Sequence, residues 1–187
     1  MWVAVVAYSA VMSVCLAAAV FDMRTRRVPN ALTYPAILLG LAGWAMVSAW
    51  SLEPEAVPGG WRACAVAVLV TAVPCGVLCA MGHLGGGDFK LMTAVAALSA
   101  SWPMVLATAV YALLLAALGG LAMAIGKRQL GDVLRRLLGA ALAGQAPPTA
   151  EQASIRIPLA VFIALGAAVA GAEHLLGWRS PWAWVGP

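Results

Sequence analysis

The feature that most constrains this chain is a series of long apolar runs separated by short polar connections. The runs are Val3–Phe21, Ala31–Trp50, Trp61–Met81, Phe89–Ser101, Pro103–Ile125 and Ile157–Leu176. Most have about the 20 residues that a helix needs to cross roughly 30 Å of hydrocarbon. Of the 187 residues, 64% are hydrophobic and 10% are charged, whereas soluble domains are about half apolar and a quarter charged. We therefore expect an all-α, polytopic membrane bundle of about six transmembrane helices. It would form one integral membrane domain, 1–187, with no separate soluble domain.

The basic residues predict how these helices are oriented. Nine of the eleven lie in connections that would share one face of the membrane: Arg24, Arg26, Arg27, Lys90, Lys127, Arg128, Arg135, Arg136 and Arg156. Cytoplasmic loops carry the excess of Lys and Arg, so this face is predicted to be cytoplasmic and both termini to lie outside. The net charge of +4 is thus typical of orientation in a lipid bilayer, such as the bacterial inner membrane, and predicts no nucleic-acid partner. Most tryptophans fall near the outer level, and Trp44 lies about two turns deeper.

Residues 127–144, "KRQLGDVLRRLLGAALAG", differ from the six runs. Leucines and a valine recur at helical spacing between arginines, which predicts an amphipathic helix on the cytoplasmic surface of the membrane. The four cysteines lie inside apolar runs and form no CxxC pair, and the chain has only two histidines. We therefore predict neither a zinc site nor any other metal or cofactor.

Two aspartates are the candidate catalytic residues. Asp22 ends the first run and Asp88 opens the fourth, with two complete runs between them. An even number of crossings returns the chain to the same side, so both acids are expected at the cytoplasmic boundary. Two carboxylates brought close tend to share a proton. One could deprotonate a water while its protonated partner donates to a peptide carbonyl oxygen, without a metal.

Plainer interpretations remain open for each acid. Asp22 fits a simple orientation cluster with its arginines, and Asp88 fits the N-cap of the next helix. Paired intramembrane acids also occur in proton relays, so a small proton-coupled transporter is the alternative function. Gly85, Gly86 and Gly87 precede Asp88. They tolerate unusual backbone angles and let an extended substrate approach the loop closely.

The two motifs together resemble those of a known family. "DMRTRRVPN", 22–30, and "GGGDFKL", 85–91, are similar to the two motifs of the prepilin peptidases, intramembrane aspartic proteases of the GxGD type. The resemblance implies that Asp22 and Asp88 are the catalytic pair. It also implies supporting roles for matching residues, which are Arg27, Pro29, Asn30, Gly85, Gly87 and Lys90. Lys90 would hold the substrate backbone, balance Asp88, or be a lysine that orients the protein in the membrane.

The resemblance also implies a substrate. Larger members carry an additional cytoplasmic domain with paired CxxC motifs that goes with N-methylation. This chain lacks those motifs and looks like the small, peptidase-only members that serve tight-adherence (Flp-type) pili. The implied partner is a prepilin with a basic leader and a hydrophobic helix, cut at the cytoplasmic face.

Helix dipoles suggest which acid holds the proton. Asp22 would lie at a helix C-terminus, where the dipole disfavours negative charge, and Asp88 at a helix N-terminus, where it favours it. The dipoles alone therefore predict a protonated Asp22 and an ionised Asp88, with the nearby arginines acting in the opposite direction.

Overall fold

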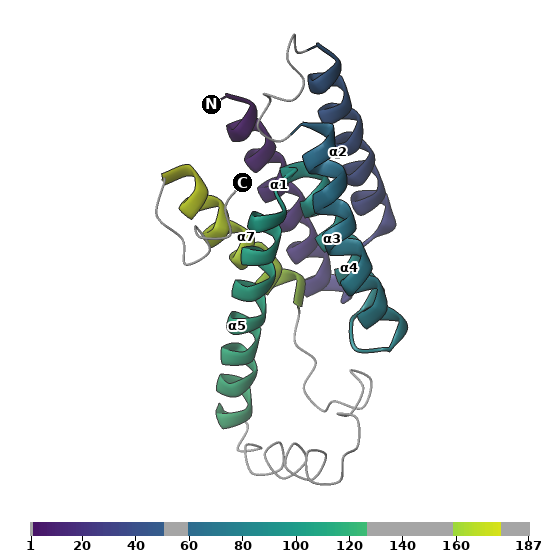
Figure 1. Ribbon diagram of the computed structural model, residues 1–187. Coiled ribbons are helices and arrows are strands. Elements are labelled where there is room, and N and C mark those ends of the chain that lie inside the picture. The colour runs from purple at the N-terminus through teal and green to yellow at the C-terminus, as the bar shows by residue number, and fades with distance from the viewer. Residues whose placement is uncertain (1, 51–59, 127–158, 177–187) are drawn as a thin grey trace.

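The structure is a computed structural model that describes residues 2–50, 60–126 and 159–176 (Figure 1). These residues form the helices α1 (Trp2–Thr25), α2 (Asn30–Trp50), α3 (Trp61–Ala80), α4 (Gly86–Ser99), α5 (Trp102–Gly126) and α7 (Leu159–Leu176). In this part of the chain there is no strand, so the predicted all-α bundle is confirmed. The amphipathic segment predicted over 127–144 lies outside the described residues.

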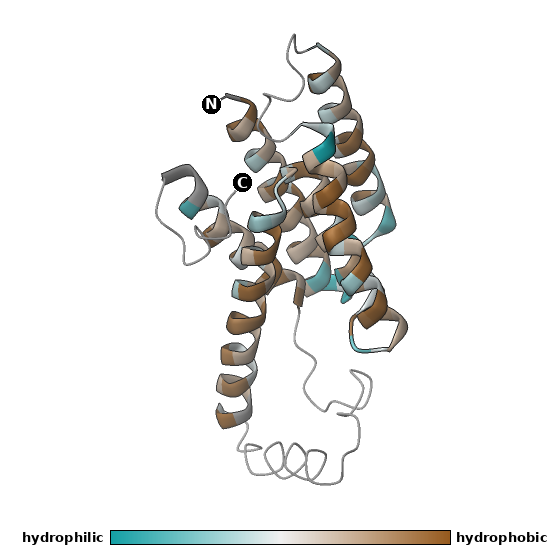
Figure 2. Ribbon diagram, viewed as in Figure 1, coloured by the Kyte–Doolittle hydropathy of each residue, from teal (hydrophilic) through white to brown (hydrophobic). Residues whose placement is uncertain are grey.

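Four of the helices are long and apolar enough to cross a membrane. The spans are Val3–Thr25, Asn30–Trp50, Trp61–Ala80 and Trp102–Met123, and α7 holds a shorter apolar stretch. Large apolar side chains point outward from them, such as Leu39 at 70% exposure and Leu113 at 64%. Figure 2 shows that hydrophobic residues predominate along α2, α3 and α5. A soluble protein rarely exposes so much apolar area, so the chain is an integral membrane protein.

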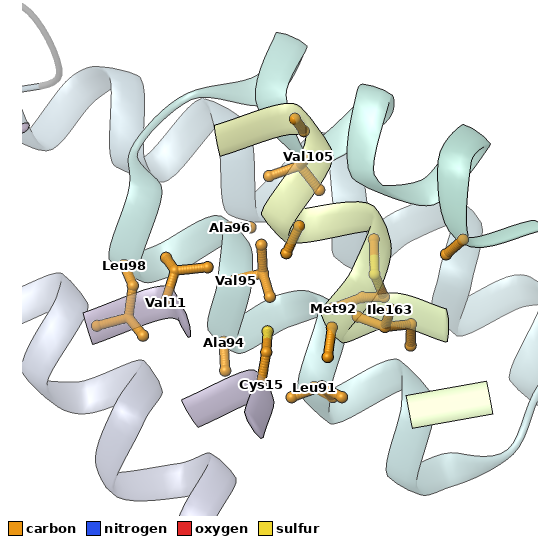
Figure 3. Packing of buried hydrophobic residues seen from close by; sticks show 14 of the residues in the cluster. Val11, Cys15, Leu91, Met92, Ala94, Val95, Ala96, Leu98, Val105 and Ile163 are labelled. Carbon is orange, nitrogen blue, oxygen red and sulfur yellow. The ribbon is translucent and has the colours of Figure 1, made fainter. Parts of the chain in front are cut away.

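α4 lies at the centre of the bundle. It packs against each of the other five described helices, and Leu91 to Leu98 are all buried. Figure 3 shows Leu91, Met92 and Val95 of α4 among side chains from α1, α5 and α7. Its 14 residues reach only about 21 Å, which agrees with the short fourth run in the sequence. The helix begins at Gly86 rather than at Phe89 as predicted, so its first turn includes Asp88.

Glycines let the helices approach each other closely. A Cβ on Gly40 of α2 would lie 2.6 Å from the backbone of Ala97 in α4. A Cβ on Gly166 of α7 would lie 2.6 Å from the carbonyl oxygen of Thr108 in α5. Helices in lipid associate through such close packing of small residues. α4 and α7 are therefore held against their neighbours with little freedom to shift.

The C-terminal end of α4 is buried, and side chains satisfy its carbonyl groups. Trp44 Nε1 donates to the Leu98 carbonyl oxygen at 3.0 Å, and Cys64 Sγ donates to the Ala97 carbonyl oxygen at 3.3 Å. Ala100 adopts a left-handed conformation (φ 47°) and closes the helix by donating to Ala96. The last carbonyls of a helix have no intrahelical partner. These contacts explain why Trp44 lies deeper than the other tryptophans.

Candidate active site

The first acid lies in the last turn of α1. Asp22 is three residues before the end of the helix, and its carbonyl oxygen accepts the Arg26 N–H at 2.9 Å. Arg26 is left-handed (φ 52°), a conformation that commonly ends helices. The Thr25 hydroxyl donates to the Phe21 carbonyl oxygen at 2.9 Å. The chain therefore turns sharply just after Asp22 and enters α2 within a few residues.

The second acid lies in the first turn of α4. Gly85 is the N-cap residue and Asp88 is the third helical residue, so the interpretation of Asp88 as an N-cap is wrong. A Cβ on Gly87 would meet the Val28 side chain at 3.4 Å, which shows that the segment after α1 lies against this turn. The α1–α2 and α3–α4 connections are at the same end of the bundle (Figure 1). The two acids are thereby brought to one place.

A cleft of about 740 Å³ opens at this place. Its lining is formed by Phe21, Asp22, Thr25, Arg26, Arg27, Val28, Pro29, Asn30, Gly85, Gly86, Gly87 and Asp88. Eight of the nine site residues expected from the sequence are in this set, and the exception is Lys90. Asp22 and Asp88 therefore line one space, which is large enough to admit a segment of another chain.

Lys90 has a contact that the sequence analysis did not foresee. Its Nζ donates to Asn30 Oδ1 at 2.8 Å and lies 5.1 Å from the centroid of the Tyr34 ring. Asn30 and Tyr34 belong to the first turns of α2. Lys90 therefore ties the start of α4 to the start of α2. It is not among the described residues that line the cleft.

The three glycines before Asp88 do not use the unusual backbone angles that glycine tolerates. Among the described glycines, positive φ occurs at Gly82 (77°). Gly85 has φ −68° and ψ 139°, which any residue can adopt. Gly85 matters for another reason, because a Cβ there would lie 2.9 Å from Asp88 Oδ2. Around a Cβ on Gly86 there is open space. The missing side chain of Gly85 thus leaves room for the Asp88 carboxyl group.

Burial has the largest effect on the pKa of Asp88. Asp88 lies outside the four long spans, and burial, with the charge of Asp22 adding to it, raises the pKa of Asp88 to about 6. Burial therefore opposes the ionisation of Asp88, whereas the helix dipole favours it. The prediction from helix dipoles, a protonated Asp22 and an ionised Asp88, stays a prediction. It considered the ends of α1 and α4 and left out the burial of Asp88.

Comparison with known protein families shows to which family the chain belongs. The model of the type IV leader peptidase family matches residues 9–125, which include both acidic motifs. The chain belongs to this family. No curated protein and no solved structure matches the chain. This leader peptidase is therefore identified by its family model, and the cleft lies within the matched residues.

One contact of this peptidase comes from beyond the matched residues. The N–H of Ala160, the second residue of α7, donates to Asp22 Oδ2 at 3.3 Å. Asp22 and Ala160 are 138 residues apart in the sequence. The donor is a backbone group, which any residue type supplies, so the residue type at position 160 does not by itself predict the contact.

Together these groups can perform acid–base chemistry. The cleft of this leader peptidase presents one carboxyl group whose pKa burial raises to about 6, and a second that accepts a backbone N–H. Among the described residues, no three His, Cys, Asp or Glu side chains gather to hold a metal ion. A carboxylate and a carboxylic acid side by side form a base and an acid that can act on one peptide bond.

Proposed function

We propose that this leader peptidase is a membrane-embedded aspartic endopeptidase that removes the basic leader from Flp-type prepilins. The observation that carries the proposal is that Asp22 and Asp88, on helices separated by two spans, line one cleft. The raised pKa of Asp88, to which the charge of Asp22 contributes, supports their acting as a pair. The supporting residues would be Gly85, Gly86 and Gly87 of the loop, with Arg27, Pro29, Asn30 and Lys90.

The proposed reaction uses both acids twice. Asp22, as the carboxylate, takes a proton from water while the water oxygen forms a bond to the scissile carbonyl carbon. Asp88 gives its proton to the carbonyl oxygen, which yields a neutral tetrahedral intermediate. When the C–N bond breaks, Asp22 gives its proton to the leaving nitrogen and Asp88 recovers one from a hydroxyl of the intermediate. Both groups end as they began, as required of general acid–base catalysts.

The position of the cleft fits a substrate that is itself in the membrane. The cleft lies at the end of the bundle that carries the basic connections, which we take as the cytoplasmic face of the bacterial inner membrane. The hydrophobic helix of the prepilin would lie in the bilayer beside the apolar faces of the bundle. Its leader would remain in the cytoplasm, and the scissile bond would lie between these two parts, at the cleft.

A co-expression assay tests the proposal. The protein would be produced with a candidate Flp-type prepilin as the wild type, Asp22→Ala and Asp88→Ala, and mass spectrometry would read the prepilin N-terminus. We expect cleavage after the leader by the wild type and at least a 10³-fold loss in both variants, because the acids act as a unit (on the order of 10³ to 10⁶ in such units).

The other outcomes are equally informative. Cleavage that survives in either single variant would refute the dyad. If the wild type cuts none of several prepilins from the same genome, the peptidase assignment to Flp-type substrates fails, and the proton-coupled transporter becomes the better explanation of the paired acids.

A further inference from the structure

The N-terminus of α7 touches the site from outside the part of the chain that the family model matches. Residues 9–125 match the family, and α7 covers Leu159–Leu176. Figure 1 shows the first turn of α7 at the same end of the bundle as the end of α1. The bond from the Ala160 N–H to Asp22 Oδ2 joins them.

The helix itself offers the Ala160 N–H no hydrogen-bond acceptor. The first N–H groups of a helix have no intrahelical acceptor, and the helix dipole places partial positive charge there. Such a terminus attracts anionic groups, and a carboxylate is one of them. Ala160 is fully buried, so water does not compete freely for its N–H. The contact therefore orients the Asp22 carboxyl group and occupies Oδ2, which leaves Oδ1 available for chemistry.

The donor is also rigidly held. Gly166 sets α7 against the backbone of α5, and Gly171 sets it against the ring of Tyr8 in α1. Ile163, Ala164 and Ala167, which continue the same helix, are buried. A donor on a packed helix fixes its partner better than one on a loop does.

We propose that the N-terminus of α7 is a component of the active site, in which the Ala160 amide positions Asp22 as the general base. This inference rests on the proposed function, since it assigns a role in the cleavage reaction. Ala160 is a positioning residue that acts through Asp22.

A backbone ester tests the role of this one N–H. Incorporation of lactic acid at position 160 of the full-length protein replaces the N–H with an oxygen and keeps the methyl side chain. The matched control is the corresponding ester at Val161, whose N–H also lies in the first turn without an intrahelical acceptor. We expect the ester at 160 to lower kcat about tenfold, as befits a hydrogen bond to a charged group. We also expect KM and the melting temperature to match those of the ester at 161. Equal kcat values for the two esters would overturn the proposal.

A second measurement does not depend on cleavage or on the folding of the esters. The amide-proton resonance of Ala160 should move upfield in Asp22→Ala, which removes the acceptor, and stay in place in Asp88→Ala. An unmoved resonance in Asp22→Ala would also overturn the proposal. If the wild type cuts no prepilin while this resonance responds to Asp22, the contact holds and the proposed function is what has failed.

Discussion

The absence of a side chain at Gly85 determines how much space the Asp88 carboxyl group has. A Cβ there would lie 2.9 Å from Asp88 Oδ2, closer than atoms can pack, and the carboxyl group is the part that can move. We predict that Gly85→Ala lowers kcat/KM about 10- to 100-fold, because a displacement of the order of 1 Å in a catalytic group costs about that much. The melting temperature should change little, since the backbone angles at Gly85 suit alanine.

Gly86→Ala is the matched control for this prediction. A Cβ at Gly86 enters open space and does not meet the Asp88 carboxyl group, and alanine is a better helix former than glycine, so activity should fall less than in Gly85→Ala. Comparable losses in both variants would show that the loop needs glycine in general, and that the Asp88 carboxyl group does not depend on the space at Gly85.

The buried carboxyl of Asp88 predicts how stability depends on pH. The pKa of Asp88 is raised from 3.8 to about 6 in the fold. Its ionisation therefore costs stability, which is lost as the pH rises through this window. Asparagine cannot ionise, so Asp88→Asn should unfold with a free energy higher by about 2–3 kcal/mol at pH 8. The difference should vanish near pH 3, below both pKa values. Chemical unfolding in detergent at both pH values measures it, and an equal difference at both would contradict the assignment.

At the scale of elements, the contact between Lys90 and Asn30 sets the register of α2 against α4. The two residues are 60 apart in the sequence, and their bond lies at the open end of the bundle. A double-mutant cycle with Lys90→Met and Asn30→Ala should give a coupling of about 0.5–1 kcal/mol in unfolding free energy, as for partly exposed charged contacts. Each single variant should also lower kcat/KM, because the beginning of α2 forms a wall of the cleft.

Tyr34→Leu serves as a control for the same element, since it removes the ring under the ammonium group and leaves the Asn30 contact in place. It should cost less activity than Asn30→Ala. Additive effects in the Lys90 and Asn30 cycle would mean that the two side chains act separately and that the contact does not align the helices.

For the whole molecule, the sequence was sufficient to predict the helical membrane bundle. Long apolar runs can be read one by one, because each span must satisfy its own backbone in lipid. The counting of crossings also placed Asp22 and Asp88 at one end, and the structure puts both in one cleft. The start of α4 was missed because three glycines indicate a loop, although Gly86 and Gly87 are helical.

What could not be predicted depends on contacts between distant elements. The α7 amide at Asp22 is a backbone group, the Lys90 contact joins residues that only packing brings together, and the burial of Asp88 is a property of the assembled bundle. The dipole argument considered two helix ends one at a time and left out the burial of Asp88.

The shortness of α4 has a consequence for how this peptidase is made. A 14-residue segment that carries an aspartate and a lysine is a poor substrate for the translocon, which favours about 20 apolar residues and disfavours such charges. α4 therefore enters the lipid with the help of the helices that will surround it. The carbonyl groups at its far end gain their partners when Trp44 and Cys64 donate to them. On the proposed function, the pair of Asp22 and Asp88 is complete only once these helices have assembled, so an unassembled chain would have no pair with which to cut.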